Sequence, residues 1–440
     1  HYTRNEWLTT MMKRAKLDSQ PATEKASWAT RLEGEEEEKE NGKEAVISYE
    51  ALGNILADFG VKDFMATKKS LWITPEMKAL NQELEMAIHY QQGDTRLLQG
   101  PTGIGKTTTL LYLGHEARTK GYLVFPLQAR NFVNQTAPMS CLIHQFLLSW
   151  IDAVGEDQLR QVPTRMYPNS GTLYDIANPS YTLDDITMVR NFARLVWELS
   201  MCTMKPVVFL IDQCNAFQEN PQMIQMYTTS TSRRVTPSEN PVGALFLDWN
   251  TFRVRCGGIF YGFSSALALM PDPHSGNSCL FFPMQPMRRV DFQGFVNFMV
   301  QDNRLPYDCF DYFDDFFVLC GGIPSEACAF GRIALGGGDG DEDSLRNRGK
   351  RTTTLYQQWK DEYMTARISF YKTRIQRLLD REKRDGLSKE CRGFASSLKS
   401  GDIWAFAPDI WIASGLLVIK DGSPELLCPA AQKAIYDCSI

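Results

Sequence analysis

The sequence predicts an α/β fold: a parallel sheet with helices on both faces, followed by a helical lid and a small C-terminal α or winged-helix-like region. Two observations support this prediction. Between residues 69 and 287, apolar strand-length segments alternate with segments of helical periodicity, and several strands are continuous apolar runs, as strands buried on both faces require. A glycine-rich string also joins one predicted strand directly to a predicted helix.

Length and composition limit the possible classes. The 440 residues are enough for two or three domains, and 43% hydrophobic and 22% charged residues are ordinary for globular proteins. A net charge of -5 provides no overall positive field toward nucleic acid or anionic lipid. No apolar run approaches the ~20 residues that cross a bilayer, so we expect no membrane span.

The cysteines favour a reducing compartment. None of the eleven forms a C-x-x-C pair, and the five histidines show no zinc-site spacing. Cys214, Cys256 and Cys320 stand inside apolar runs, where a thiol is a small buried hydrophobe. This pattern favours an intracellular reducing compartment over a disulfide scaffold. The choice of compartment, with the nucleus or cytoplasm favoured and the mitochondrion as the alternative, depends on the family resemblances given below.

Composition shifts divide the chain into five parts. Four consecutive glutamates near the N-terminus repel one another, and a glycine- and aspartate-rich stretch after residue 335 cannot form a core. The parts are an N-terminal extension with an acidic linker (1–68), an α/β core (69–287), a helical lid (288–335), a flexible linker (336–353) and a basic helical C-terminal region (354–440).

Within the core, Thr74 and Pro75 indicate a helix start, because threonine caps helices and proline suits the first turn. Apolar residues then recur at helical spacing to Tyr90. The other elements follow from the alternation of short apolar runs, typical of strands, with segments of helical periodicity. We expect strands at 96–99, 122–127, 206–212 and 257–264, helices at 107–119, 141–154 and 184–202, and an irregular insertion at 156–182.

Beyond the core, the predictions are mainly helical. The lid segment is expected to be helical and to end near the string Gly321-Gly322-Ile323-Pro324, which resembles a Gly-x-Pro turn in the helical region after an ATPase core. A long polar helix is expected over 354–384. Short apolar runs after Trp404, punctuated by glycine and proline, favour a winged-helix-like tail.

The glycine-rich string is Gly100-Pro101-Thr102-Gly103-Ile104-Gly105-Lys106-Thr107. Its glycines let the backbone turn tightly and aim N–H groups at phosphate oxygens, and the following helix adds partial positive charge. Lys106 supplies a cation for the β- and γ-phosphates, and Thr107 a hydroxyl ligand for Mg2+. The sequence therefore predicts a P-loop that binds ATP or GTP with magnesium through these residues and Thr108.

Asp212 ends a continuous apolar strand, where a side chain of a parallel sheet points into the ligand crevice. We expect it to hold Mg2+ together with Thr107. Many P-loop ATPases place a glutamate next in sequence to orient the attacking water, whereas this chain has Gln213. Gln213 or Glu219, the nearest downstream carboxylate, would then orient water, and nucleotide binding is better supported than fast hydrolysis.

Further site residues are predicted by position alone. Ser264 and Ser265 follow the strand at 257–264, where a polar side chain would sense the γ-phosphate, although serines there are commonly loop caps. Arginines that could act as an arginine finger, or lie solvated on the surface, are Arg233, Arg234, Arg288 and Arg289.

Residues 95–330 resemble the NTPase domains of Crinkler and retrotransposon-hot-spot proteins of oomycetes, fungi and trypanosomatids. Three strings support this resemblance: Gly100–Thr107, Phe209–Phe217 and Gly321–Pro324. Members of that group run an Asp-Gln-x-Asn-Ala phrase after the second apolar strand, which would make Gln213 a family feature. The resemblance implies a multidomain ATPase of AAA or STAND type acting in nuclei, with a small helical lid. No Crinkler leader motif or nuclease constellation is visible.

A second resemblance is to the GTP-binding protein of the mitochondrial small ribosomal subunit, in the death-associated protein family. It shares the order P-loop, strand 122–127, Asp212 with a nearby Asn215-Ala216, and Asp248-Trp249 before the next strand. It implies a structural nucleotide in a large assembly. The acidic net charge differs from the basic character that rRNA contact favours, and the last 100 residues have no clear counterpart there.

The segment 344–400 has 15 Lys and Arg against 6 Asp and Glu, with interleaved aromatics. Such a segment can follow a phosphate backbone and stack on bases, or form an amphipathic helix with its aromatics in a core. Nucleic acid is therefore one expected partner, and a homo-oligomer or larger assembly is another. No N-K-x-D-type guanine motif is present, so ATP is favoured over GTP.

Overall fold

The computed structural model describes most of the α/β core, the lid and the C-terminal region, and residues 46–440 belong to one compact unit. All structural statements below concern the described residues. These are 46–52, 70–89, 95–129, 154–161, 171, 172, 174, 205–213, 259–263, 279–336, 353–385, 388–400, 411, 414–420 and 423–438.

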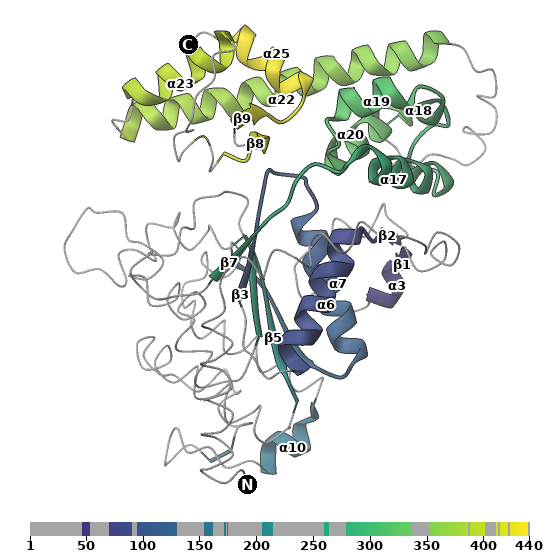
Figure 1. Cartoon of the computed structure of the whole chain (residues 1–440), viewed down its shortest axis with the longest axis vertical. Coiled ribbons are helices and arrows are strands. Elements are labelled where there is room, and N and C mark those ends of the chain that lie inside the picture. Colours follow the sequence, from purple (N-terminus) through teal and green to yellow (C-terminus); the bar gives the residue numbers. More distant parts are fainter. Residues whose placement is uncertain are drawn as a thin grey trace, which may run out of the picture. The chain divides into compact units, whose positions relative to one another are not determined.

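A parallel sheet forms the centre of the α/β core. Its strands are β3 (Thr95–Gln99), β4 (Leu123–Gln128), β5 (Val207–Asp212), β6 (Ile259–Phe263) and β7 (Cys279–Pro283). They pair in the order β4-β5-β6-β3-β7. Strand β3, which leads into the glycine-rich loop, therefore lies between β6 and β7, and Figure 1 shows it beside β7. Every residue of β5 is buried, in agreement with its continuous apolar run.

The four predicted core strands are confirmed to within two residues at each end. β7 is a fifth strand that the sequence analysis missed. It consists of five residues and ends at Pro283, and such a short apolar run is a weak signal. A second correction concerns the insertion predicted as irregular from residue 156, because Glu156–Gln161 forms helix α10. Arg160 and Glu156 pair one turn apart in it.

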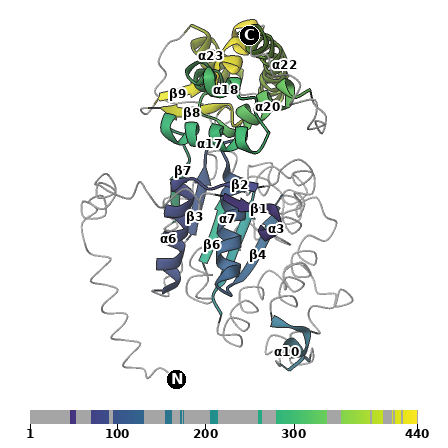
Figure 2. The same ribbon diagram turned by 90° about the vertical axis from the view of Figure 1, so that its right-hand side faces the viewer.

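Helices α6 (Pro75–His89) and α7 (Lys106–Thr119) cover one face of the sheet (Figure 2). The expected cap is present, since Thr74 Oγ1 accepts a hydrogen bond from the Met77 N–H at 3.3 Å. Apolar side chains of both helices join one buried cluster with β4 and β5. Of the helices predicted at 141–154 and 184–202, all residues except Val154 lie outside the described part of the chain.

Residues before the expected start of the core also pack on it. Strand β1 (Val46–Ser48) pairs antiparallel with β2 (Ser70–Trp72), and α3 (Tyr49–Leu52) follows β1. Leu52 is buried in the cluster that includes the leucines of α7. Residues 46–52 and 70–72 therefore pack together with the core that the sequence analysis places at 69–287.

The lid consists of α17 (Arg289–Gln301), α18 (Asp308–Asp311), α19 (Phe313–Cys320) and α20 (Pro324–Ala334) around a phenylalanine-rich cluster. The turn expected at Gly321–Pro324 separates α19 from α20. Gly321 has a left-handed φ of 62° at the end of α19, and Pro324 occupies the first turn of α20.

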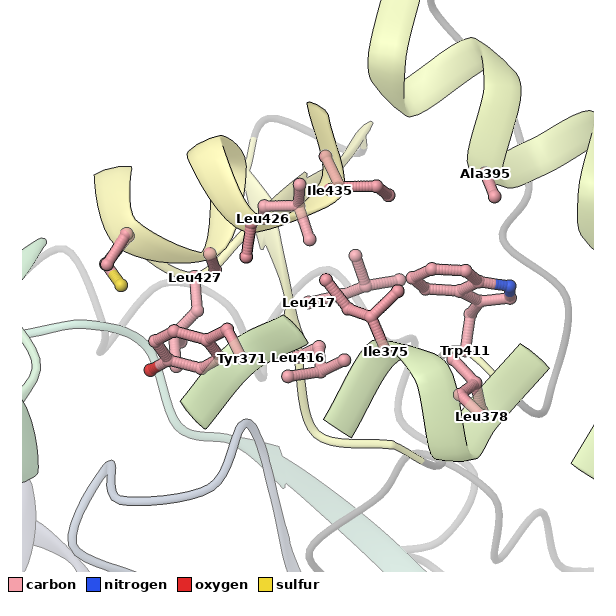
Figure 3. Packing of buried hydrophobic residues seen from close by; sticks show 14 of the residues in the cluster. Tyr371, Ile375, Leu378, Ala395, Trp411, Leu416, Leu417, Leu426, Leu427 and Ile435 are labelled. Atoms are coloured by element: carbon pink, nitrogen blue, oxygen red, sulfur yellow. The ribbon is translucent and has the colours of Figure 1, made fainter. Parts of the chain in front are cut away.

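The C-terminal region has a core of its own. Long helix α22 (Thr353–Asp385) packs with α23 (Ser388–Ser400), the antiparallel hairpin β8 (Leu417–Lys420) and β9 (Ser423–Leu426), and α25 (Pro429–Asp437). Figure 3 shows Trp411 beside Ile375 of α22. A helix–hairpin–helix set is what a winged-helix-like tail requires, and that assignment stays a prediction.

In the described part of the chain, no single helix is long and apolar enough to cross a bilayer. The pair α19 and α20 meets that criterion only jointly, as two helices bent by 116°, and both contribute to the lid cluster. Cys320 is buried there as a free thiol, which confirms its interpretation as a small hydrophobe. Cys214 and Cys256 lie outside the described residues.

Candidate nucleotide site

The loop between β3 and α7 has the backbone shape of a phosphate cradle. Gly103 and Gly105 have left-handed φ values of 85° and 108°, which favour glycine. A Cβ at Gly103 would lie 1.8 Å from Ser325 Oγ of the lid, whereas open space surrounds Gly105. Gly105 is the N-cap of α7 without a side-chain cap, so the first-turn N–H groups of Thr107 and Thr108 have no acceptor within the helix. An anion would supply that acceptor.

Lys106 lies folded back on this loop. Its Nζ donates hydrogen bonds to the carbonyl oxygens of Gly100 at 2.8 Å and Pro101 at 2.6 Å. The side chain is 5% exposed. Burial lowers the pKa of the Lys106 ammonium to about 7, although the nearby Asp212 carboxylate acts in the opposite direction. A bound triphosphate would favour the charged form and could replace the two carbonyls as its partner.

Thr107 and Asp212 meet although 105 residues separate them in sequence. Thr107 Oγ1 donates to the Asp212 carboxylate, at 3.1 Å from Oδ2 and 3.3 Å from Oδ1. Asp212 is 1% exposed, and this burial raises its pKa to about 7 against the opposing effects of its hydrogen bonds and Lys106. The two residues predicted to bind magnesium are thus brought together at the carboxyl end of β5.

Gln128 is a site residue that the sequence analysis missed. It ends β4 directly opposite Asp212 in the strand register, and its Nε2 donates to Asp212 Oδ2 at 3.1 Å. A lone glutamine at a strand end has no recognisable spacing, so only the register reveals it. Gln213, which follows Asp212, adopts a left-handed φ of 57°.

These residues fit a magnesium ion bound with a nucleotide. No group of three or more His, Cys, Asp or Glu side chains gathers anywhere in the described ranges, so Asp212 stands as a single carboxylate beside a hydroxyl. Mg2+ commonly takes one or two protein ligands and fills its octahedron with waters and phosphate oxygens. Buried acceptors that lack donors, Gln128 Oε1 and Gln213 Oε1, could accept hydrogen bonds from such waters. When bound, the ion neutralises charge on the phosphates.

The loop is also bonded to the C-terminal region. The Thr102 N–H donates to the Gly415 carbonyl at 3.2 Å. Arg374 of α22 donates to Thr102 Oγ1 at 3.3 Å and to the Ser414 carbonyl at 2.9 Å. Ile104 is buried in the C-terminal cluster. The middle of the P-loop is therefore held from outside the sheet.

Two further predicted site residues, Arg288 and Arg289, fall within the described part of the chain. Arg288 and Arg289 are exposed on the lid, where they bond to Asp291 and Asp314. Their action as arginine fingers stays a prediction. Residues that lie outside the described part of the chain are Glu219, Ser264, Ser265, Arg233 and Arg234.

Within the basic segment, α22 directs three of its tyrosines into the interior. Tyr356, Tyr363 and Tyr371 are buried in the lid and C-terminal clusters, whereas Phe370 is 42% exposed. The basic side chains of α22 that bond to other elements are Lys360 (to Asp315), Arg367 (to Glu326), Lys372 (to Asp437) and Arg374. The amphipathic interpretation is thus confirmed for the three buried tyrosines.

No protein-family model matches the chain, and no curated protein matches it. Among solved structures, Drosophila ORC bound to DNA aligns at 13% identity and a TM-score of 0.39, over 94% of this chain and 99% of that chain. Katanin, from a study of its self-assembly, aligns at 14% and 0.32 over 64% and 76%. AMPPCP-bound DnaA from Aquifex aeolicus aligns at 15% and 0.32 over 63% and 68%. Structural similarities this weak do not assign the chain to a family.

The fold assignment rests on the chain's own geometry. In this parallel sheet, strand β3 enters a glycine-rich loop, and strand β5, which lies on the other side of β6, ends in a carboxylate bonded to the loop threonine. The sheet therefore contains both halves of a nucleotide–metal site. The chain has the fold of a P-loop nucleoside triphosphatase.

Proposed function

We propose that this chain binds and hydrolyses nucleoside triphosphates with Mg2+, ATP by preference, and that the reaction drives a conformational change in a Crinkler-like multidomain ATPase of AAA or STAND type. The observation that most supports this proposal is the 3.1 Å hydrogen bond between Thr107 and Asp212 beside the glycine-rich loop. In this proposal Lys106 binds the phosphates, Thr107 and Asp212 hold the ion, and Gln213 or Glu219 orients water.

A second function is supported by Gln213. An amide can orient water but is a poor general base, and within the described residues Asp212 is the carboxylate that acts on Lys106. The alternative is a protein that binds GTP or ATP without turnover, as a structural component of an assembly such as the mitochondrial small ribosomal subunit. We also propose that the chain forms an oligomer or joins a larger assembly, and that residues 344–400 contact nucleic acid.

Turnover and binding of ATP and GTP by the full chain, with and without Mg2+, test both functions. Lys106→Ala should abolish nucleotide binding and turnover, because it removes the cation of the loop. Lys120→Ala is the matched control, since Lys120 follows the same helix at its far end and forms an exposed pair with Glu85. It should behave as the parent chain does.

The outcomes separate the candidates. ATP turnover that depends on Mg2+ and Lys106 would support the ATPase. Tight Mg2+-dependent binding without turnover would support the structural role, and co-purification of rRNA would place it in a ribosomal subunit. A parent chain that binds neither nucleotide would contradict both functions.

A further inference from the structure

Two buried amide oxygens beside Asp212 have no hydrogen-bond donor in the described chain. They are Gln128 Oε1 and Gln213 Oε1. A buried carbonyl oxygen left unsatisfied costs about 1–3 kcal/mol, so two of them flanking one carboxylate need a physical reason. Gln128 is the register partner of Asp212 on β4, and Gln213 follows Asp212 in the chain and donates its backbone N–H to that carboxylate.

The hydrogen-bonding character of the two oxygens defines which kind of group can bind them. Both are acceptors only, and Asp212 between them is an acceptor that already receives hydrogen bonds from Thr107 and Gln128. Their partner must therefore be a donor, and the nearby carboxylate favours one that carries positive charge. A water molecule on a divalent cation meets both conditions, because coordination makes its protons stronger donors.

The other end of the Gln128 amide has a separate effect. Its Nε2 bonds to Asp212 Oδ2 at 3.1 Å, while Thr107 bonds to both carboxylate oxygens. Together these donors fix the plane of the carboxylate before any cation arrives. Groups that orient a metal ligand in this way tune metal affinity without binding the metal themselves.

We propose that Gln128 is a positioning residue of the nucleotide site: its N–H holds the Asp212 carboxylate, and its Oε1 accepts a hydrogen bond from a water on the divalent cation. Gln213 Oε1 accepts a second one. This inference rests on the proposed Mg2+–nucleotide function and assigns the orientation of Asp212 and of the cation's water molecules to two glutamines, one at the end of β4 and one directly after β5.

The test measures binding of AMPPCP to the full chain by calorimetry, in EDTA and over a series of free Mg2+ concentrations. Gln128→Met keeps the side-chain length and removes both the N–H donor and the oxygen acceptor of the amide. It should reduce the Mg2+-dependent gain in affinity about tenfold or more, while the affinity in EDTA changes less than twofold. Gln301→Met, on the exposed surface of α17, is the matched control and should change neither quantity.

An unchanged Mg2+ gain in Gln128→Met would overturn the inference, and so would an equal loss in EDTA, which would indicate a structural role alone. Gln128→Glu is the second variant, because it keeps an acceptor oxygen at similar size. Its Mg2+ gain should exceed that of Gln128→Met, and a gain no larger would overturn the role of Oε1. A parent chain without any AMPPCP binding would contradict the proposed function itself and the inference with it.

Discussion

At the level of single residues, the nucleotide site holds two ionisable groups of opposite sign away from water. Lys106 is 5% exposed and Asp212 is 1% exposed, and burial moves the pKa of each to about 7 from opposite directions. In the unfolded chain both groups are charged at neutral pH, so removing them from water on folding costs stability. Stability at this point of the fold is lower than packing alone would allow, as is common at functional sites.

Asp212→Asn should stabilise the chain at pH 8 in the absence of nucleotide and metal. The folded-state pKa of Asp212 lies above its ordinary value of 3.8, so the folded state loses stability as pH rises from about 4 to about 7, and the loss persists above pH 7. Asparagine carries no charge to bury. We expect its Tm to exceed that of the parent by about 2 °C or more at pH 8, and to match it near pH 4.

Thermal denaturation followed by fluorescence checks this prediction. Asp437→Asn is the control, because Asp437 is exposed beside Lys372, which lowers its pKa. That variant should show no gain at pH 8. A lower Tm for Asp212→Asn at pH 8 would mean that hydrogen bonding to the carboxylate outweighs its burial.

A single site residue could be predicted from the sequence when neighbouring residues indicate its role, and not when its role depends on a distant strand. Gly100–Thr107 is a local string whose spacing alone indicates phosphate binding, and Asp212 stands at the end of an apolar run. Gln128 acquires its role from a residue 84 positions away, through strand register. A single sequence does not encode that register in any local pattern.

At the level of elements, one buried carboxylate joins the lid to the C-terminal region. Glu326 of α20 is 1% exposed and accepts hydrogen bonds from Tyr363 Oη at 2.6 Å and Tyr371 Oη at 2.7 Å. Arg367 Nε donates to the same carboxylate at 2.8 Å, which raises the pKa of the guanidinium. Three side chains of α22 thus converge on one residue of α20.

Arg367→Met should destabilise this junction by about 3–5 kcal/mol, because it leaves the Glu326 carboxylate buried without a cation. The double variant Arg367→Met with Glu326→Gln should lose less than the sum of the two single variants, since the charge is then removed with its partner. Urea denaturation followed by circular dichroism measures the differences. Arg377→Met, on an exposed position of α22, controls for the loss of one arginine and should change little.

If the losses of the two single variants add up to the loss of the double variant, Arg367 and Glu326 are not coupled.

Helix α22 also shows which properties of an element could not be predicted from the sequence. Its helical character followed from periodicity, but whether its aromatics contact nucleic acid or a core did not. Tyr356, Tyr363 and Tyr371 recur at spacings of about two helical turns, which places them on one face, and the partner of that face comes from distant sequence.

At the level of the whole molecule, the P-loop joins sequence segments more than 250 residues apart. Thr102 bonds to Arg374 and Gly415, and Gly103 accepts a hydrogen bond from the Ser325 N–H at 3.3 Å. The sequence predicted each of these regions separately, because each has its own periodicity or string. Their contact with the loop could not be predicted, since no local pattern at residues 102–104 differs from that of a solvent-facing loop.

These contacts predict that the C-terminal region contributes to nucleotide affinity. Phosphate binding requires the loop to keep one conformation, and a loop held by outside hydrogen bonds loses less conformational entropy when the ligand arrives. Arg374→Met removes the charged donor to Thr102 and to the Ser414 carbonyl but keeps an apolar stem. We expect AMPPCP with Mg2+ to bind about three- to tenfold more weakly, corresponding to roughly 1 kcal/mol.

Calorimetry on the full chain measures this affinity, with Arg377→Met as the control one turn further along α22. The control should bind as the parent does, because Arg377 is exposed. Hydrogen exchange in the P-loop supplies an independent readout: without nucleotide, residues 102–104 should exchange faster in Arg374→Met and at the parent rate in the control. Equal affinity and equal exchange in all three chains would show that the loop keeps its shape without the C-terminal region, and that the two parts act independently.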